Sequence, residues 1–383
     1  MVEFKTDRQD SLIINILAEM LTINYRVTQA VPLYETLESY IVKYHGPNEF
    51  KSVQSAVKAL HESRNEIAQL TCYDDPILLQ KYNTILIDYY VGMSFLATKF
   101  KFGDDAESID ITWVWQDSLT GEKKFTNKDL SLELNSVLYN LGAVINNMGT
   151  HTPIEGDNIK TVSQKFQEAA WIFDHLKESS KSLSPATRSH DFSVENLLFL
   201  STLQLAQSQY CFFKKADNAK MSAAMMAKIT NQLKTFFEDT ERYARSSPVL
   251  KKGTYLPTIA FYKSYYQALA YFHKALEAKD EVKNKGEGMG LAGGLMKKAL
   301  SLIETAGKLA ESSTRDACAA KKAAFNAEYE EIALQNKNVY FEKDASDKEL
   351  ESVGFESKNF TLYRSIEAQL TQAYSSAESF NCF

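Results

Sequence analysis

Helix-breaking residues are scarce in this chain, which holds only 7 prolines and 15 glycines among its 383 residues. Average usage, at about 5% for proline and about 7% for glycine, would give many more of both. Proline removes a backbone donor and glycine loosens the backbone, so a chain with few of them can form long uninterrupted helices. The sequence therefore predicts a mainly helical fold.

The apolar pattern agrees with this prediction. Apolar side chains recur at helical spacing in most windows, for example at Leu33, Leu37 and Ile41, and turn signals separate the windows. From residue 193 onward five long helices follow one another with short connections, which is typical of a tetratricopeptide-like array of antiparallel neighbours. Helices are predicted near residues 10–27, 33–45, 49–71, 76–100, 129–148, 157–181, 193–216, 221–245, 257–281, 289–312 and 315–336.

One interval departs from the helical pattern. Between Ser108 and Asp129 the segment IDITWVWQDSLTGEKKFTN alternates apolar and polar residues around a Leu-Thr-Gly-Glu turn. This alternation predicts a β-hairpin packed on the helical body. No stretch has the composition of a flexible linker, so we expect one continuous elongated domain.

Charge and cysteine usage exclude several classes of protein. The chain carries 43 Lys and Arg against 49 Asp and Glu, a net charge of -6, which argues against a nucleic-acid partner. No run approaches 18 apolar residues, so no membrane-spanning helix is predicted. The four cysteines, Cys72, Cys211, Cys318 and Cys382, lie far apart without a CxxC pair. They indicate reduced thiols in a cytoplasmic protein.

Sequence patterns of catalysis and of metal binding are missing. GxSxG, HExxH, P-loop and EF-hand patterns do not occur, and no two of the six histidines have helical ligand spacing. We therefore expect neither an enzyme nor a metal, cofactor or small-molecule substrate. A GxGxxG match does run from Gly288 to Gly293, but it follows a predicted helix instead of a strand. Dinucleotide binding needs the strand, so these glycines are interpreted as a flexible loop between two helices.

The segment 192–237 is the most informative part of the chain. Its first helix is apolar nearly all round, and its second carries a methionine-rich stripe. Such helices are either sandwiched between neighbours or expose a binding surface, and methionine suits adaptable recognition of a partner helix. Periodicity alone favours simple core filling over binding. The stripe of the second helix consists of Met221, Met225, Met226, Ile229 and Leu233.

Several segments resemble the Bro-one domain of the ALIX, rhophilin and HD-PTP group. They are the ITWVWQDSLTG hairpin, SVLYNLGA (136–143), KFQEAAWIFDHLKE (165–178), LAQSQYCFFKKADNAKMSAAMMAKITNQ (205–232) and NVYFEKD (338–344). The resemblance runs from about residue 32 to 365 and implies a curved, banana-shaped tetratricopeptide-like helical solenoid with a small β-sheet. Residues 1–31 are then expected to form an N-terminal helical extension, residues 32–365 a single domain and residues 366–383 a C-terminal helical tail.

The resemblance also implies a function. Bro-one domains are adaptors, and a hydrophobic patch on their concave face receives the C-terminal amphipathic helix of an ESCRT-III subunit of the charged multivesicular body protein type. Met225 and Ile229 lie four residues apart and so share one helix face, and Phe212 comes from the preceding antiparallel helix. By alignment, the implied patch is Phe212, Met225 and Ile229, with Lys160, Lys215 and Lys228 as a polar rim.

The implied setting is endosomal sorting, multivesicular body formation and membrane remodelling. A cytoplasmic protein of this kind would be recruited to endosomes mainly through its partner, with the plasma membrane as a second location. Tyr340 matches a family tyrosine that is a phosphotyrosine docking site in some relatives. Its flanking Phe341 and the β-like local pattern favour an ordinary packed tyrosine instead.

A second interpretation comes from other branches of the same family. Rhophilin-like proteins are signalling scaffolds for small GTPases and the cytoskeleton, and protozoan ALIX-like adhesins act in cell adhesion and phagocytosis. ALIX-like proteins and rhophilins both carry further domains beyond the Bro-one match. We therefore expect this chain to be a fragment of a larger protein.

Overall fold

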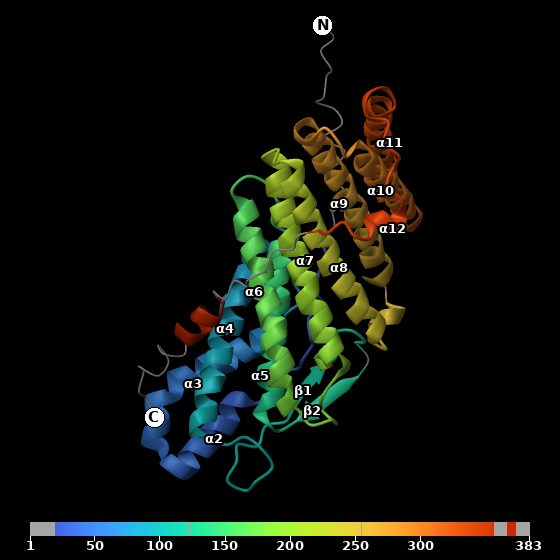
Figure 1. The fold of residues 1–383 in the computed structure, drawn as a ribbon. Helices are drawn as coiled ribbons and strands as arrows, with labels where there is room; N and C mark the ends of the chain where they lie inside the picture. The colour runs from blue at the N-terminus through green and yellow to red at the C-terminus, as the bar shows by residue number, and fades with distance from the viewer. Residues whose placement is uncertain (1–19, 122, 254, 356–365, 373–383) are drawn as a thin grey trace. The chain divides into compact units, whose positions relative to one another are not determined.

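The computed structural model describes residues 20–121, 123–253, 255–355 and 366–372, and most of them are helical (Figure 1). Its helices coincide with the predicted ranges from 33–45 to 315–336 within a few residues. The long helices are α2 (Leu33–His45), α3 (Pro47–Ile67), α4 (Pro76–Lys99), α5 (Leu130–Thr150), α6 (Asn158–Ser179), α7 (Val194–Asn218), α8 (Ala223–Ser246), α9 (Tyr255–Lys285), α10 (Met289–Leu309) and α11 (Ser312–Gln335). Shorter elements are η1 (Ser180–Ser182), η2 (His190–Phe192), η3 (Leu250–Lys252), the π-helix η4 (Asn336–Tyr340) and α12 (Asp347–Leu350).

The chain divides into two compact units. The hairpin unit comprises Leu21–Pro153, Gln164–Gln204 and Leu362–Phe383, and the patch unit comprises Met1–Met20, Ile154–Ser163 and Leu205–Thr361. Two of the boundaries fall inside α6 and α7, so each of these helices contributes residues to both units. The expected domain boundaries at residues 32 and 365, and the curved outline, stay predictions. Residues 366–372 are helical, and the rest of the expected C-terminal tail lies outside the described residues.

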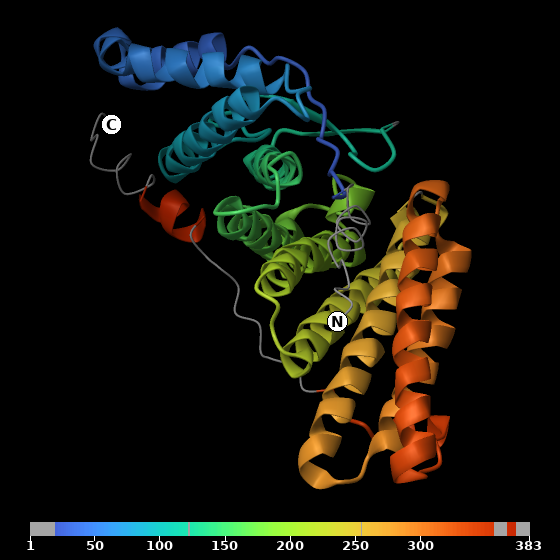
Figure 2. The ribbon, with the colours of Figure 1, turned by 90° about the horizontal axis from the view of Figure 1, so that it is seen from above.

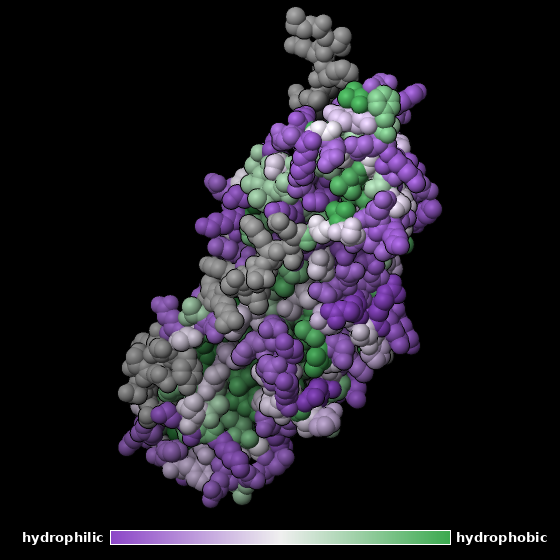
Figure 3. All heavy atoms as spheres, in the orientation of Figure 1, coloured by the Kyte–Doolittle hydropathy of each residue, from purple (hydrophilic) through white to green (hydrophobic). Residues whose placement is uncertain are grey.

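The patch unit contains the predicted run of successive helices. Figure 2 shows α8, α9, α10 and α11 following one another with short connections. Aromatic rings pack them together: Tyr266 of α9 stacks on Phe237 of α8 at 5.7 Å and meets Phe213 of α7 edge-on at 5.8 Å. On α9, Phe272 stacks on Phe325 of α11 at 4.2 Å. The surface drawn over α10 and α11 is mainly hydrophilic, with a few apolar spots (Figure 3).

The GxGxxG segment does not form the flexible loop that the sequence suggested. Only Gly288 has a left-handed backbone, with φ of 111° at the N-cap of α10, whereas Gly290, Gly293 and Gly294 are buried inside that helix. A Cβ on any of these three would collide with residues 343–345. The glycines thus let the chain that follows η4 lie directly against α10, and this close packing explains why the prediction was wrong.

The hairpin unit contains the predicted antiparallel hairpin. Strand β1 (Trp113–Gln116) pairs with β2 (Lys124–Asn127), so that Trp115 faces Phe125 across the ladder. The side chains of Trp113 and Trp115 are both fully buried, as the alternating pattern requires for the inner face. This sheet and the surrounding helices confirm the mainly helical fold with a small β element.

The predicted helix at 10–27 is wrong where the structure describes it. Residues 20–28 form no helix: Thr28 makes an isolated antiparallel β-bridge with Trp115, and the amide of Gln116 donates to the carbonyl of Val27, at 2.8 Å. The Asn140 side chain accepts from the Arg26 amide at 2.7 Å and donates to the Arg26 carbonyl at 2.9 Å. These contacts replace the hydrogen bonds of a helix, so tertiary partners override the local periodicity. Residues 10–19 lie outside the described residues.

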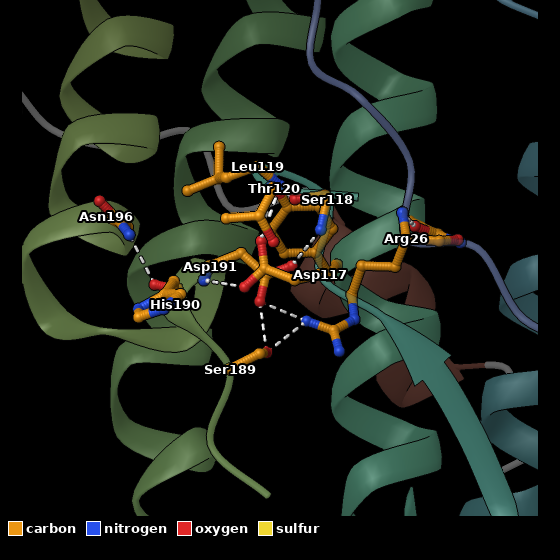
Figure 4. A network of polar contacts seen from close by, with 11 residues as sticks. Arg26, Asp117, Ser118, Leu119, Thr120, Ser189, His190, Asp191 and Asn196 are labelled. Atoms are coloured by element: carbon orange, nitrogen blue, oxygen red, sulfur yellow. Dashed lines mark hydrogen bonds and ion pairs between the residues drawn. The ribbon is translucent and has the colours of Figure 1, made fainter. Parts of the chain in front are cut away.

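A buried ionic network ties this extended segment to the hairpin (Figure 4). Arg26 pairs with Asp191 and donates to Ser189 at 2.8 Å, and both charged side chains have no exposed surface. Asp191 also accepts from the Ser118 amide at 2.8 Å, just beyond β1. The Asp191 amide donates to Asp117 at 3.2 Å. Three distant stretches of the chain are therefore joined at one buried point.

A second buried pair lies behind the hairpin. Arg64 of α3 contacts Glu133 of α5 at 2.6 Å, and both side chains are fully buried. The same carboxylate accepts from the indole of Trp115 at 2.6 Å and from the hydroxyl of Tyr89 at 2.9 Å. Burial raises the pKa of Tyr89 well above its ordinary value, so this hydroxyl stays a donor. The carboxylate is therefore fully partnered, as a buried charge must be.

Candidate partner-binding site

The candidate patch lies on the pair formed by α7 and α8 in the patch unit. Four residues join the helices, and Lys220 among them takes a left-handed backbone with φ of 48° that reverses the chain. The side-chain amide of Gln209 on α7 donates to the carbonyl of Ile229 on α8, at 3.2 Å. So short a connection favours antiparallel neighbours, and this hydrogen bond sets their register.

This register places the three predicted anchors at neighbouring levels along the two helices. Phe212 lies one turn after Gln209 on α7. At the same level on α8, one turn before Ile229, lie Met225 and Met226. Phe212 is 43% exposed, and Met225 and Ile229 are half-buried. A half-exposed aromatic side chain, together with a flexible methionine and a stiffer isoleucine at neighbouring levels, has the composition expected of a binding surface.

The opposite face of the same helices is packed. On α8 the residues that alternate with the anchors are buried, so the methionine-rich helix both fills the core and exposes a stripe. On α7 the neighbours of Phe212, Cys211 and Phe213, are buried, and burial raises the pKa of the Cys211 thiol to about 12. Cys211 is therefore an inert packing residue. The buried residues of α8 nearest to the anchors are Met226, Ala227, Thr230 and Leu233.

The three predicted rim lysines take different positions. Lys160 is exposed on the first turn of α6, where the hydroxyls of Ser163 and Ser208 meet at 3.0 Å and join α6 to α7. In an antiparallel pair, the residue one turn before Ser163 on α6 lies at the same level as the residue one turn after Ser208 on α7. These residues are Lys160 and Phe212. Lys215 is exposed on α7, one turn beyond Phe212.

The exposure of two further residues, Lys228 and Met221, bears on the predicted rim and patch. Lys228 is half-buried on α8, so it offers less of its charge to a partner than Lys160 does. Met221, which the predicted patch does not include, is 45% exposed at the start of the turn into α8. Met221 does belong to the methionine-rich stripe that the sequence indicates between Met221 and Leu233.

Tyr340 lies away from the anchors in sequence, at the end of η4. It is half-buried and lines a cavity of 310 Å³ whose other walls include Lys279, Glu328 and Glu331. Lys279 contacts Glu331 at 2.9 Å and Glu328 at 3.3 Å inside this cavity. The local conformation is a π-helix and not the β-like pattern that the sequence suggested. Its role as a phosphotyrosine stays a prediction.

The described part of the chain contains neither a metal centre nor a membrane span. Among these residues no group of three or more His, Cys, Asp or Glu side chains is arranged to hold a metal ion. None of the helices that the structure describes is both long and apolar enough to cross a bilayer.

The fold defines the class of protein: a mainly helical domain with a small two-stranded antiparallel sheet. The model of the BRO1-like domain family matches residues 20–379, nearly the whole chain and more than the span of 32–365 expected from the resemblance. The chain belongs to this family and is of the ALIX and Bro1 type.

Curated relatives are longer than this chain. It is 28% identical to the vacuolar-sorting protein BRO1 of Arabidopsis thaliana, over 69% of the chain and 32% of that protein. It is 26% identical to programmed cell death 6-interacting protein of Xenopus laevis, over 88% of the chain and 38% of that protein. The chain thus spans about a third of the length of each of these relatives.

Two solved structures share the fold. The ALIX BRO1 domain, solved in complex with CHMP4C, aligns with a TM-score of 0.77 at 23% identity, over 90% of this chain and 94% of that one. A Bro1 domain described for endosomal targeting aligns with a TM-score of 0.80 at 16% identity, over 95% of this chain and 98% of that one. Similarity at these identities establishes the fold.

Proposed function

We propose that this chain is an adaptor that binds the C-terminal amphipathic helix of an ESCRT-III subunit of the charged multivesicular body protein type. The proposal depends on one observation: Phe212 of α7 is 43% exposed, and Met225 and Ile229 of α8 are half-buried at neighbouring levels. The ALIX BRO1 domain solved with CHMP4C supports the choice of partner, because it has the same fold. The protein would act in endosomal sorting and reach endosomes from the cytoplasm, mainly through this partner.

Docking follows from the shape and chemistry of the patch. A ligand helix would lay its apolar face on the α7–α8 pair and cover the exposed part of the Phe212 ring. The flexible side chain of Met225 would adapt to the ligand, and the half-buried Ile229 would supply a fixed contact. Anchors at the centre of such an interface each contribute about 2–4 kcal/mol.

The rim lysines would affect the rate of encounter more than the affinity. Lys160 and Lys215 are exposed, so their ion pairs with acidic residues of the ligand would contribute at most about 1 kcal/mol each. Their positive field would still steer an acidic helix toward the patch, and salt would weaken this effect. We expect Lys160→Glu to slow association at low salt while dissociation changes little.

The test is a calorimetric titration of the chain with a synthetic ESCRT-III C-terminal helix. Ile229→Asp places a charge at the centre of the patch, and we expect affinity to fall at least 30-fold, which corresponds to about 2 kcal/mol. Ile77→Asp is the matched control, because Ile77 is 81% exposed in the hairpin unit and should bind like wild type. Circular dichroism and melting should be unchanged in both variants. Undiminished binding by a folded Ile229→Asp variant would refute the proposal.

A further inference from the structure

Three large apolar side chains protrude from the patch unit where α11 passes into η4. Leu334 is 60% exposed, Val339 63% and Phe341 78%. We call these three residues the apolar tip. In Figure 3 apolar atoms reach the surface over the end of α11 that Figure 1 draws uppermost. Phe341 is far more exposed than Phe212, so the core does not account for it.

The backbone of the tip is held in uncommon conformations. A π-helix spans Asn336–Tyr340, and such turns often occur at functional sites. Phe341 then takes the left-handed conformation with φ of 57°, which bulky residues avoid. If the backbone were in a relaxed conformation here, the Phe341 side chain would not need to face solvent. Strain of this kind persists only where the surrounding structure imposes it.

The surrounding structure does impose it, through hydrogen bonds on both sides of Phe341. The Asn336 side chain donates to the Glu342 carbonyl at 2.7 Å and accepts from the Glu342 amide at 2.9 Å. The Phe341 amide donates to the Asn336 carbonyl at 2.7 Å. The Glu342 carboxylate accepts from the amides of Gly288 and Gly290 at the start of α10, at 2.9 and 2.7 Å. The tip is therefore preorganised, and docking would cost it little conformational entropy.

The exposed charges of the turn that contains Phe341 are lysines, whereas Glu330 and Glu331 are exposed one turn before Leu334 on α11. Lys337 and Lys343 are exposed, and neither makes an ion pair with another described residue. The one acidic residue between them, Glu342, has its carboxylate turned inward onto the α10 N-terminus. What this turn presents to solvent is therefore apolar side chains flanked by lysines.

We propose that the apolar tip inserts into the interfacial region of an anionic lipid bilayer, with Lys337 and Lys343 on the lipid headgroups. Apolar side chains combined with lysines match such a surface, because the first partition into the acyl boundary and the second meet phosphates. A protein helix fits less well, since the tip protrudes and the cavity beside it is lined by the charged groups of Lys279, Glu328 and Glu331. The contact would add a direct attachment to recruitment through a protein partner.

The test is co-sedimentation of the full chain with vesicles of 70% phosphatidylcholine and 30% phosphatidylserine. Phe341→Asn removes the ring while asparagine tolerates the left-handed backbone, so melting should stay the same or rise. We expect at least a fivefold loss of vesicle binding for this variant and for Lys337→Glu with Lys343→Glu. The control Phe212→Asn should bind vesicles like wild type, since the proposed helix site is separate. Wild type should bind pure phosphatidylcholine vesicles several-fold more weakly.

Three results would overturn the proposal. The first is wild-type binding to anionic vesicles that Phe341→Asn leaves intact, and the second is no wild-type binding to these vesicles at all. The third is self-association in light scattering that Phe341→Asn abolishes, which would make a second copy of the chain the occupant. Loss of ESCRT-III helix binding in Ile229→Asp bears on none of these results, so the two proposals fail independently.

Discussion

The buried pair of Arg26 and Asp191 yields the sharpest prediction about stability. Arg26→Met keeps an unbranched side chain of similar length that can still pack on the Phe192 ring, which the guanidinium now covers at 4.3 Å. What it removes is the charge, so Asp191 is left buried and unpaired. Breaking such a pair on one side costs about 3–5 kcal/mol. Asp191 would still accept from Ser118 and Ser189, which places the expected loss near the lower end, at about 3 kcal/mol.

Tryptophan fluorescence reports this loss of stability in the hairpin unit, where the ionic network lies. The three tryptophans, Trp113, Trp115 and Trp171, all belong to the hairpin unit, which also contains the ionic network. With a urea dependence of about 2 kcal/mol per molar, a loss of about 3 kcal/mol lowers the unfolding midpoint by roughly 1.5 M. The far-ultraviolet signal also reports the helices of the patch unit and should shift less.

A double variant separates the charge from the packing. Asp191→Asn keeps an oxygen that can accept from the Ser118 amide but removes the buried negative charge. We expect Arg26→Met with Asp191→Asn to be about 2 kcal/mol more stable than Arg26→Met alone, because no charge is then left unpaired. If the two variants unfold at the same urea concentration, the charge is not what the network stabilises, and the reasoning is refuted.

Two more predictions concern the patch unit. Gly290→Ala should lower stability by about 1–3 kcal/mol, because its Cβ would collide with the Lys343 carbonyl. In the same helix Gly307→Ala should raise stability by about 0.5–1 kcal/mol, because its Cβ would make only an ordinary contact with Cys318, at 3.8 Å. Melting temperatures that shift in the same direction in both variants would contradict this. Burial, and secondarily Lys321, lowers the pKa of His273. A neutral histidine in the fold contributes stability above pH 6.5 that is lost as pH falls, so His273→Gln should flatten the melting temperature between pH 7 and 5. An equally steep pH dependence in the variant would disprove this.

Local pattern was sufficient for most of the secondary structure. Helical spacing over Leu33, Leu37 and Ile41 and alternation through Trp113 and Trp115 each depend on neighbouring residues, and both elements formed as predicted. The described part of the helix predicted at 10–27 does not form, because residues far away in the sequence satisfy its backbone: Asn140 bonds to the amide and carbonyl of Arg26, and Gln116 bonds to the carbonyl of Val27. A window of sequence contains no information on such a partner.

The candidate site shows the same division. The spacing of Met225 and Ile229 is enough to place them on one helix face. Periodicity could not separate the half-buried Met225 from the buried Met226 beside it, because that depends on which side α7 occupies. The position of Phe212 along α8 likewise follows from the hydrogen bond between Gln209 and Ile229, which sets the register of the two helices.

By itself, the sequence determined that this chain is helical, that one hairpin interrupts it, and that one helix carries a methionine-rich stripe. These features follow from residues a few positions apart, where the repeat of a helix or a strand decides which side chains share a face. The tertiary structure decided which glycines lie inside α10 and which way Glu342 turns. It also decided that Phe341 points to solvent. Those outcomes depend on close approach between distant segments, and a close approach has no period along the chain.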